Sequence, residues 1–197
     1  MNYLAHLMLA DDSDASRIGN LLGDFTKGTL ASLAEVYPDE IIRGIKMHRA
    51  VDRFTDSHEV FKNSRALIAP ERRRFSGIII DIIFDHYLSV HWNDYHHQPL
   101  EHFVGDVYRA LDEHPEWRAG RLARAFPMMR HENWLVTYAT IEGVELTLER
   151  VSRRGKRTTP IAGGIIDLRD NYAEFEASFQ AFMPSLLDFT DTWKSKH

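Results

Sequence analysis

The sequence contains no cysteine. Disulfide bonds and thiolate metal sites are therefore excluded, and a metal would have to be held by His, Asp, Glu or Asn side chains. Several catalytic signatures are missing as well: there is no Gly-x-x-x-x-Gly-Lys phosphate loop, no Gly-x-Ser-x-Gly elbow and no dinucleotide fingerprint. His-Glu occurs at His58-Glu59 and His131-Glu132, but no second histidine follows at the spacing of zinc proteases.

Long hydrophobic runs are also absent. The strongly apolar stretch 77–84 is interrupted by Asp81 and is far shorter than the roughly 20 residues that a membrane-spanning helix needs. The first residues carry no basic segment, and acidic residues directly follow the short apolar run Tyr3–Leu9, which is unlike a secretory signal. We therefore expect a cytoplasmic protein without a membrane partner.

Positive charge is slightly outnumbered, with 24 Lys and Arg against 29 Asp and Glu, which gives a net charge of −5 with the 11 histidines neutral. This balance argues against nucleic acid as the main partner. The basic residues are nevertheless clustered, at Arg72–Arg74, in the series Arg118, Arg121 and Arg124, and at Arg153–Arg157. Such clusters are commonly only solvated, but on an acidic protein they also suit an acidic partner that docks locally.

Helical periodicity dominates the chain, and strand signals are nearly absent. Ser13 or Asp14 can cap a first long helix that ends near Gly28, and Pro38 with Asp39 and Glu40 can open a second. We predict an all-α protein with one helical domain over residues 1–197 and a mobile loop at 152–164. Further helices are expected at 59–68, 72–92, 100–113, 117–126, 141–153 and 168–182, with a final amphipathic stretch at 186–193.

Polar residues on faces that should be buried are the most informative feature. His48 and Asp52 lie four residues apart on an otherwise apolar helix face, as do Asp81 and Asp85, with His86 adjacent; Asn20 and Asp24 form a third such pair. Burial of a carboxylate destabilises the folded protein by roughly several kcal/mol unless the group is paired or binds a metal. Structural hydrogen-bonded pairs are one explanation, and a shared divalent cation is the other.

Carboxylate, imidazole and water ligands suit Mn²⁺ or Mg²⁺, with Fe²⁺ as a further possibility, and such an ion promotes hydrolysis of a phosphate ester. His6, within the apolar run Tyr3–Leu9, is either a core histidine or another ligand. Arg49 follows His48, and it would either hold a phosphate oxygen through its fork of donors or pair with Asp52 or Asp56.

Four motifs in order carry a family resemblance: MNYLAHL at residues 1–7, GNLLGDF at 19–25, GIKMHRAVDRFTD at 44–56 and DIIFDHYLSVHW at 81–92. Together with the spacing between them and the chain length, they resemble bacterial acyl carrier protein phosphodiesterase, also called ACP hydrolase. The resemblance implies hydrolysis of the phosphodiester that joins 4′-phosphopantetheine to a serine of holo acyl carrier protein. It also implies a divalent cation, with Mn²⁺ favoured, and a distant relation to the all-helical HD-type phosphohydrolases.

Position by position, the resemblance carries functional residues onto each motif, including His91 in the last one. We expect metal ligands among His6, Asp24, His48, Asp52, Asp81, Asp85 and His86. Catalytic residues are expected among Asp24, His48, Arg49, Asp52 and Asp85. Substrate contacts are expected from Asn2, Asn20, Arg49, Arg72, Arg73 and Arg74, the last three forming a rim for the acidic carrier protein.

The sequence departs from the HD signature in one respect, because it contains no His-Asp dipeptide and has Asp85-His86 instead. The resemblance therefore implies a rearranged or permuted HD-like site. Two alternatives stand beside the carrier-protein phosphodiesterase: an HD-like hydrolase of a nucleotide or another small phosphoester, and a non-enzymatic helical binding module whose His/Asp pairs are structural.

Overall fold

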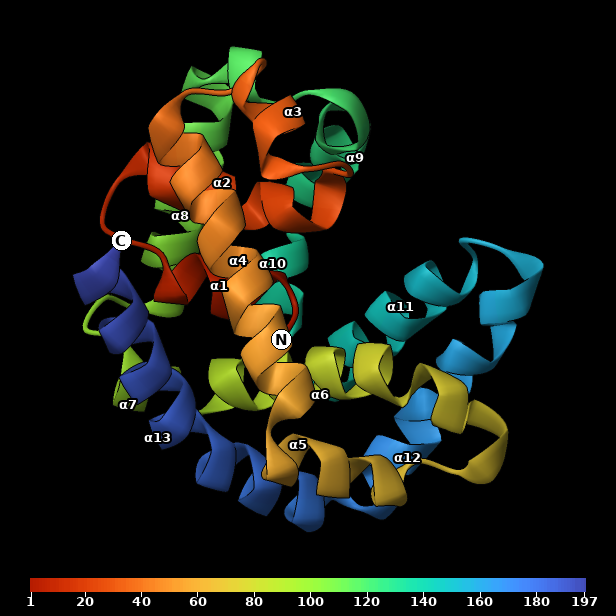
Figure 1. Cartoon of the computed structure of the whole chain (residues 1–197). Coiled ribbons are helices and arrows are strands. Elements are labelled where there is room, and N and C mark those ends of the chain that lie inside the picture. The colour runs from red at the N-terminus through yellow and green to blue at the C-terminus, as the bar shows by residue number, and fades with distance from the viewer.

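All regular secondary structure is helical, which confirms the predicted all-α class. The computed structural model describes residues 1–197 as thirteen α-helices and four short 3-10 segments (Figure 1). The α-helices are α1 (Tyr3–Leu9), α2 (Asp14–Phe25), α3 (Leu30–Ala34), α4 (Asp39–Ser57), α5 (Glu59–Ser64), α6 (Ser76–Val90), α7 (Trp92–Tyr95), α8 (Leu100–Glu113), α9 (Gly120–His131), α10 (Trp134–Thr137), α11 (Ile141–Ser152), α12 (Gly164–Asp170) and α13 (Tyr172–Lys196). The 3-10 segments are η1 (Arg65–Leu67), η2 (Pro70–Phe75), η3 (Pro115–Trp117) and η4 (Lys156–Gly163).

Helix starts follow local chemistry. The Ser13 hydroxyl accepts a hydrogen bond from the backbone N–H of Ser16 at 3.1 Å and caps α2, as the sequence predicted. Helix α4 begins directly after Pro38 with Asp39 and Glu40 in its first turn. Carboxylates there stabilise the helix because they lie at the positive end of its dipole. These two helices carry most of the candidate site.

Several predicted boundaries were wrong. The helix expected at 72–92 begins only at Ser76, because Pro70 opens the 3-10 segment η2 instead. The helix expected at 117–126 runs from Gly120 to His131. Residues 172–196 form one long helix in place of the two stretches expected at 168–182 and 186–193, and Pro184 lies inside it. The stretch 152–164, expected to be a mobile loop, contains the 3-10 segment η4.

Helices α2 and α4 cross closely because two glycines face each other at the crossing. A Cβ atom on Gly19 would lie 2.5 Å from the Ile41 carbonyl oxygen, and one on Gly44 would lie 2.8 Å from the Gly19 Cα atom. Backbone meets backbone here, so the side chains further along both helices are held at short distances. This crossing fixes the position of His48 relative to α2.

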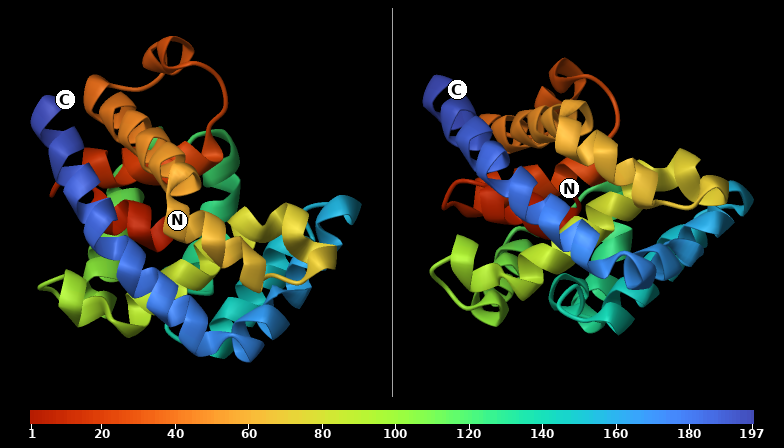
Figure 2. Two further views of the ribbon diagram at one scale, coloured as in Figure 1. Left: turned by 60° about the horizontal axis from the view of Figure 1, so that its bottom comes forward. Right: turned by 90° about the horizontal axis from the view of Figure 1, so that it is seen from below.

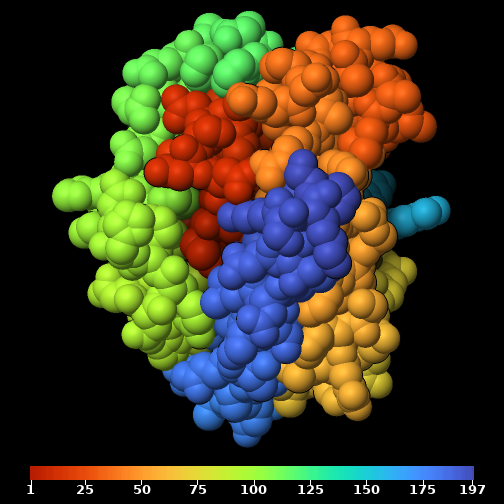
Figure 3. Space-filling view, turned by 60° about the vertical axis from the view of Figure 1, so that its left-hand side comes forward, coloured from red at the N-terminus to blue at the C-terminus, as the bar shows by residue number.

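The first residues of the chain lie inside the helical assembly (Figures 1 and 2). Tyr3, Leu4, Leu7 and Leu9 on α1 join a continuous apolar core of 53 buried residues to which α6 also contributes. Helix α13 packs against α4, α5 and α6, and Figure 3 shows it lying across one face of the molecule, with the red N-terminal residues visible in a strip beside it. None of the helices combines the length and the apolar character needed to span a bilayer.

Candidate metal centre and active site

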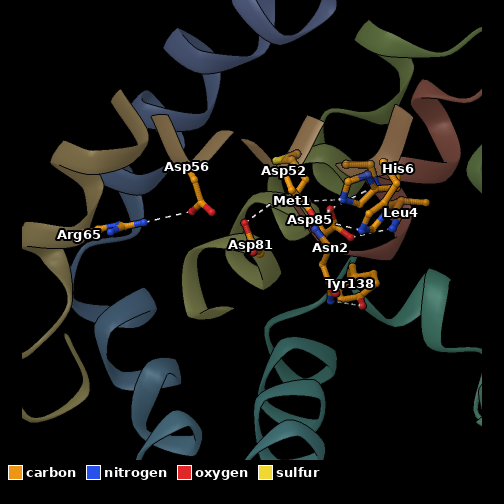
Figure 4. Close-up of polar contacts among 12 residues, drawn as sticks. Met1, Asn2, Leu4, His6, Asp52, Asp56, Arg65, Asp81, Asp85 and Tyr138 are labelled. Carbon is orange, nitrogen blue, oxygen red and sulfur yellow. Dashed lines mark hydrogen bonds and ion pairs between the residues drawn. The ribbon is translucent and has the colours of Figure 1, made fainter. Parts of the chain in front are cut away.

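Two buried histidines and one aspartate form a compact cluster at the junction of α1 and α4. His6 Nε2 lies 3.1 Å from Asp52 Oδ1 (Figure 4). His48 Nε2 lies 3.1 Å from Asp52 Oδ2. The two imidazole rings stack with their centroids 3.7 Å apart. One nitrogen from each ring and one carboxylate oxygen all lie within 4.8 Å of one another. The structure thus joins the predicted His48–Asp52 pair to His6 from a different helix.

The donor set of this cluster fits a divalent cation. Both ring nitrogens of His6 and Nδ1 of His48 are buried without a hydrogen-bond partner, although buried polar groups are normally paired. The Nε2 atoms of both rings lie 3.1 Å from Asp52, one from each of its carboxylate oxygens. Neighbouring ligands at about 2.1 Å from one octahedral ion lie about 3 Å apart, which these contacts match. His6, His48 and Asp52 can therefore serve together as ligands.

The electrostatics of the cluster also suit a cation. Burial, reinforced by the neighbouring charge of His48, lowers the pKa of His6 to about 3, so this imidazole is neutral. Burial alone would lower the pKa of His48 and raise that of Asp52, but their mutual contact outweighs burial. The pKa of His48 is therefore raised and that of Asp52 is held far below its usual range. Asp52 is thus an ionised carboxylate beside a neutral imidazole.

Gly23 provides the space that His48 occupies. A Cβ atom on Gly23 would lie 2.1 Å from Cγ and 2.2 Å from Cδ2 of the His48 ring, a distance that real contacts do not reach. The backbone of α2 therefore packs directly against the His6–His48–Asp52 cluster. Gly23 was not among the predicted site residues, although it lies within the GNLLGDF motif and directly precedes Asp24.

An acidic pocket of about 290 Å³ adjoins the cluster at Asp52, which forms part of its wall. Four carboxylates from α2, α4 and α6 line it, those of Asp24, Asp52, Asp56 and Asp81. Figure 4 shows Asp52, Asp56 and Asp81 on facing helices. The side chain of Asp24 is accessible from the pocket, yet the protein packed around it raises its pKa to about 6, with a contribution from the charge of Asp52. Burial likewise raises the pKa of Asp81.

Asp85 holds α1, and with it His6, in place. Its buried carboxylate accepts hydrogen bonds from the backbone N–H groups of Asn2, Leu4 and Ala5 at 3.2, 2.8 and 3.3 Å (Figure 4). It therefore satisfies the free donors at the N-terminal end of α1 and interacts favourably with the positive end of the helix dipole. Burial raises the pKa of this carboxyl group to about 7. The structure gives Asp85 contacts to α1 and does not bring it into the His6–His48–Asp52 cluster.

Two further contacts fix the start of α1. The Asn2 side-chain amide donates a hydrogen bond to the Tyr138 hydroxyl at 2.6 Å, and the Met1 ammonium group lies 2.5 Å from Asp81. Asn2 also lines the acidic pocket. Asp81 and Asp85 share one helix face as predicted, but one faces the pocket and the other the end of α1.

The structure places the remaining predicted residues outside the acidic pocket. His86 uses both ring nitrogens, Nδ1 at 2.7 Å from the Tyr138 carbonyl oxygen and Nε2 at 2.9 Å from the Tyr172 hydroxyl. His91, which directly follows α6, contacts Glu176 through Nε2 at 2.6 Å. Asn20 is fully buried and donates to the Ser16 carbonyl oxygen at 3.0 Å, and Arg49 is partly exposed. Neither of these last two lines the pocket.

The arginines predicted to form a rim are mostly engaged within the protein. Arg72 donates to the carboxylate of buried Asp167 through Nε at 2.8 Å and Nη2 at 2.7 Å. Arg74 donates to the Arg157 carbonyl oxygen at 2.8 Å. Arg73 makes one long contact, at 3.4 Å, with the Ile68 carbonyl oxygen. None of the three lines the acidic pocket.

The sequence did not indicate two polar residues of the pocket, Arg154 and Thr55. Arg154 lines the pocket and donates to the Tyr3 hydroxyl at 3.2 Å, and Thr55 presents a buried hydroxyl that has no hydrogen-bond partner. The basic stretch after α11 was a signal for Arg154, but nothing in the sequence places it beside Tyr3. Thr55 lies three residues after Asp52, so the helix period alone could have put it near the same face.

Comparison with known proteins identifies the family. A family model described as acyl carrier protein phosphodiesterase matches residues 1–186. Relatives of that name occur in Photorhabdus laumondii subsp. laumondii, 32% identical over 95% of this chain and 94% of the relative, and in Pectobacterium atrosepticum, 33% identical over 98% of both. A third, from Yersinia pestis, is 32% identical over 95% of this chain and 96% of its own length. The chain belongs to the acyl carrier protein phosphodiesterase family.

Membership in the acyl carrier protein phosphodiesterase family confirms the resemblance seen in the four motifs. The match covers nearly the whole chain, so α8 to α13 belong to it as much as the motif-bearing first half. No solved structure matches the chain. The relation to HD-type phosphohydrolases therefore stays a prediction.

Proposed function

We propose that this protein hydrolyses the phosphodiester between 4′-phosphopantetheine and a serine of holo acyl carrier protein, releasing apo carrier protein. The observation that carries the proposal is the His6–His48–Asp52 cluster, whose Asp52 also lines an acidic pocket, in a chain whose relatives are named acyl carrier protein phosphodiesterase. The acidic pocket, with a volume of about 290 Å³, is lined by residues of all four sequence motifs.

A divalent cation is part of the proposal because the pocket alone would repel its substrate. Four carboxylates line the pocket, and a phosphodiester carries a further negative charge. We propose His6, His48 and Asp52 as ligands, and Mn²⁺ as the ion, with Mg²⁺ and Fe²⁺ as alternatives. A cation held there would stabilise negative charge on the phosphoryl group and would lower the pKa of bound water.

Residues of the chain itself then have distinct tasks. The Arg154 guanidinium and the Tyr3 hydroxyl, which contact each other at 3.2 Å on the pocket wall, donate to phosphate oxygens. Asp24, with its pKa raised to about 6, is ionised at neutral pH and still basic enough to accept a proton from the attacking water. The water oxygen bonds to phosphorus, the bond from phosphorus to the serine oxygen breaks, and that oxygen takes up a proton.

The test is incubation of the purified protein with Mn²⁺ and holo acyl carrier protein, followed by mass spectrometry of the carrier. With the wild-type enzyme we expect the carrier to lose the phosphopantetheine mass, and only when the cation is added. With the Asp52→Asn enzyme we expect the carrier to keep its mass, while the circular dichroism of that variant shows unchanged helical content. A carrier protein of unchanged mass, together with hydrolysis of nucleotides by the same preparation, would reject this function in favour of a small phosphoester.

A further inference from the structure

A basic pocket of about 360 Å³ lies directly beside the acidic one. The two pockets share Tyr3 and Arg154 as wall residues. The basic pocket is lined by four arginines, which we call the arginine shelf: Arg121 and Arg124 on α9, Arg150 on α11, and Arg154 just after α11. Tyr3 and Arg154 thus separate an acidic pocket from a basic one.

Most of the positive charge on the shelf is not neutralised within the protein. Arg121, Arg124 and Arg154 have no carboxylate within 4.0 Å, whereas Arg150 lies 2.8 Å from Glu132. Some exposed arginines elsewhere on the molecule, such as Arg109 and Arg153, are paired with a glutamate, at 2.8 and 2.9 Å. Three unneutralised guanidinium groups around one pocket therefore form a local positive field on a chain whose net charge is −5.

The shelf is also held in shape before anything binds. Arg121 and Arg124 lie three residues apart and so share one face of α9. The guanidinium of Arg121 lies over the Phe25 ring at 6.0 Å from its centroid, and that of Arg150 lies over Trp134 at 4.1 Å. Such contacts orient the flat guanidinium groups and leave their N–H edges for an anion.

We propose that the arginine shelf docks a carboxylate-rich surface of the protein substrate next to the serine that carries the phosphodiester. This inference rests on the proposed function, because the shared wall of Tyr3 and Arg154 leads from the shelf to the reacting phosphate. The shelf arginines Arg121, Arg124 and Arg154 are exposed, so they can reach side-chain carboxylates on a folded partner. A nucleic-acid strand continuing from the shelf would run into the four carboxylates of the acidic pocket.

The test compares the double variant Arg121→Glu/Arg124→Glu with wild-type enzyme loaded with Mn²⁺. Binding of apo acyl carrier protein, which lacks the prosthetic group, is measured by calorimetry, and KM and kcat are measured on holo carrier protein. We expect Kd for apo carrier protein and KM for holo carrier protein to rise about tenfold or more, and kcat to change by about twofold or less. Added salt is expected to weaken wild-type binding more steeply than binding by the variant.

Arg53→Glu/Lys62→Glu is the matched control, since it makes the same total charge change at two exposed basic residues that line neither pocket. Its Kd and KM are expected to stay within about twofold of wild type. Equal effects of the shelf variant and the control, or no effect of the shelf variant, would overturn the proposal. So would binding of a short single-stranded oligonucleotide in place of apo carrier protein. Loss of apo carrier binding by the shelf variant, with no phosphopantetheine release by wild type, would reject the proposed function and keep the docking surface.

Discussion

The His48 ring fills the space above Gly23, so that the backbone of α2 and the imidazole on α4 are in direct contact. A Cβ atom at Gly23 would lie 2.1 Å from the His48 Cγ atom. No rotation of the methyl group relieves such an overlap, because Cβ is fixed by the backbone. The ring would have to leave its position beside His6 and Asp52.

We therefore expect Gly23→Ala to lower Mn²⁺ affinity and phosphodiesterase activity by about tenfold or more, through displacement of one ligand. Calorimetric titration with Mn²⁺ and the holo carrier assay measure the two effects. Gly105→Ala is the matched control, because a Cβ atom there meets nothing within 4 Å on the exposed face of α8. That control should keep full activity and gain about 0.5–1 kcal/mol of stability from its higher helix propensity. Equal metal affinities for the two variants would show that His48 is not a ligand.

The two predicted histidines His6 and His86 are expected to behave differently. His6 has two buried ring nitrogens without hydrogen-bond partners, whereas His86 contacts Tyr138 and Tyr172 through both of its own. We expect His6→Gln to weaken Mn²⁺ binding about 10- to 100-fold with the helical content kept. His86→Gln should leave Mn²⁺ affinity within about twofold and lower stability by about 1–3 kcal/mol, since a buried hydrogen bond is lost.

Metal content after dialysis and urea unfolding with EDTA present separate these two outcomes. Because EDTA removes the cation, the unfolding experiment reports on packing and hydrogen bonds alone. If His86→Gln lost the metal while His6→Gln retained it, the predicted ligand role of His86 would stand and the assignment of His6 would be wrong.

The buried carboxyl group of Asp85 should make stability depend on pH. Burial raises its pKa to about 7 in the folded protein, from 3.8 in its ordinary state. Between these values the folded state binds the proton more tightly than the unfolded state, so the contribution is present at low pH and is lost as the pH rises through 7. We expect this group alone to remove about 2–3 kcal/mol of stability between pH 5 and pH 8.

Urea unfolding of the metal-free protein at several pH values measures this contribution. Asp85→Asn is the comparison, because asparagine keeps an acceptor for the N–H groups at the start of α1 but does not titrate. The difference in stability between wild type and Asp85→Asn should therefore shift in favour of the variant as the pH rises from 5 to 8. Parallel pH curves for the two proteins would contradict the burial-driven shift.

The sequence was enough to predict the helical class and part of the site, because both depend on local spacing. His48 and Asp52 are four residues apart on one helix, and the structure brings them into contact. The four motifs also identified the family. Helix ends were less predictable, since Pro70 redirected the start of α6 and Pro184 did not interrupt α13.

Contacts between helices account for what the sequence could not give. Spacing places Asp81 and Asp85 on one face of α6, but only the path of α1 decides that Asp81 faces the pocket while Asp85 binds α1. Gly23 was missed for a similar reason. A glycine within a helix shows its purpose only when the side chain packed against it, here that of His48, is known.

Arg72 is expected to act on stability and not on docking. Its guanidinium makes two hydrogen bonds to Asp167, whose side chain is only 5% exposed. Removal of the arginine leaves a buried carboxylate without its countercharge, which typically costs about 3–5 kcal/mol. We therefore expect Arg72→Met to lower the free energy of unfolding, measured by urea unfolding, by about 3 kcal/mol. The loss stays at the lower end of the range because Asp167 still accepts a hydrogen bond from the Ala69 N–H at 3.1 Å.

KM of the Arg72→Met variant for holo carrier protein should remain within about twofold of wild type. Arg73→Met, at the exposed neighbouring position, should change neither quantity, and a rise in KM for both variants with unchanged stability would instead support the predicted carrier-protein rim at Arg72–Arg74.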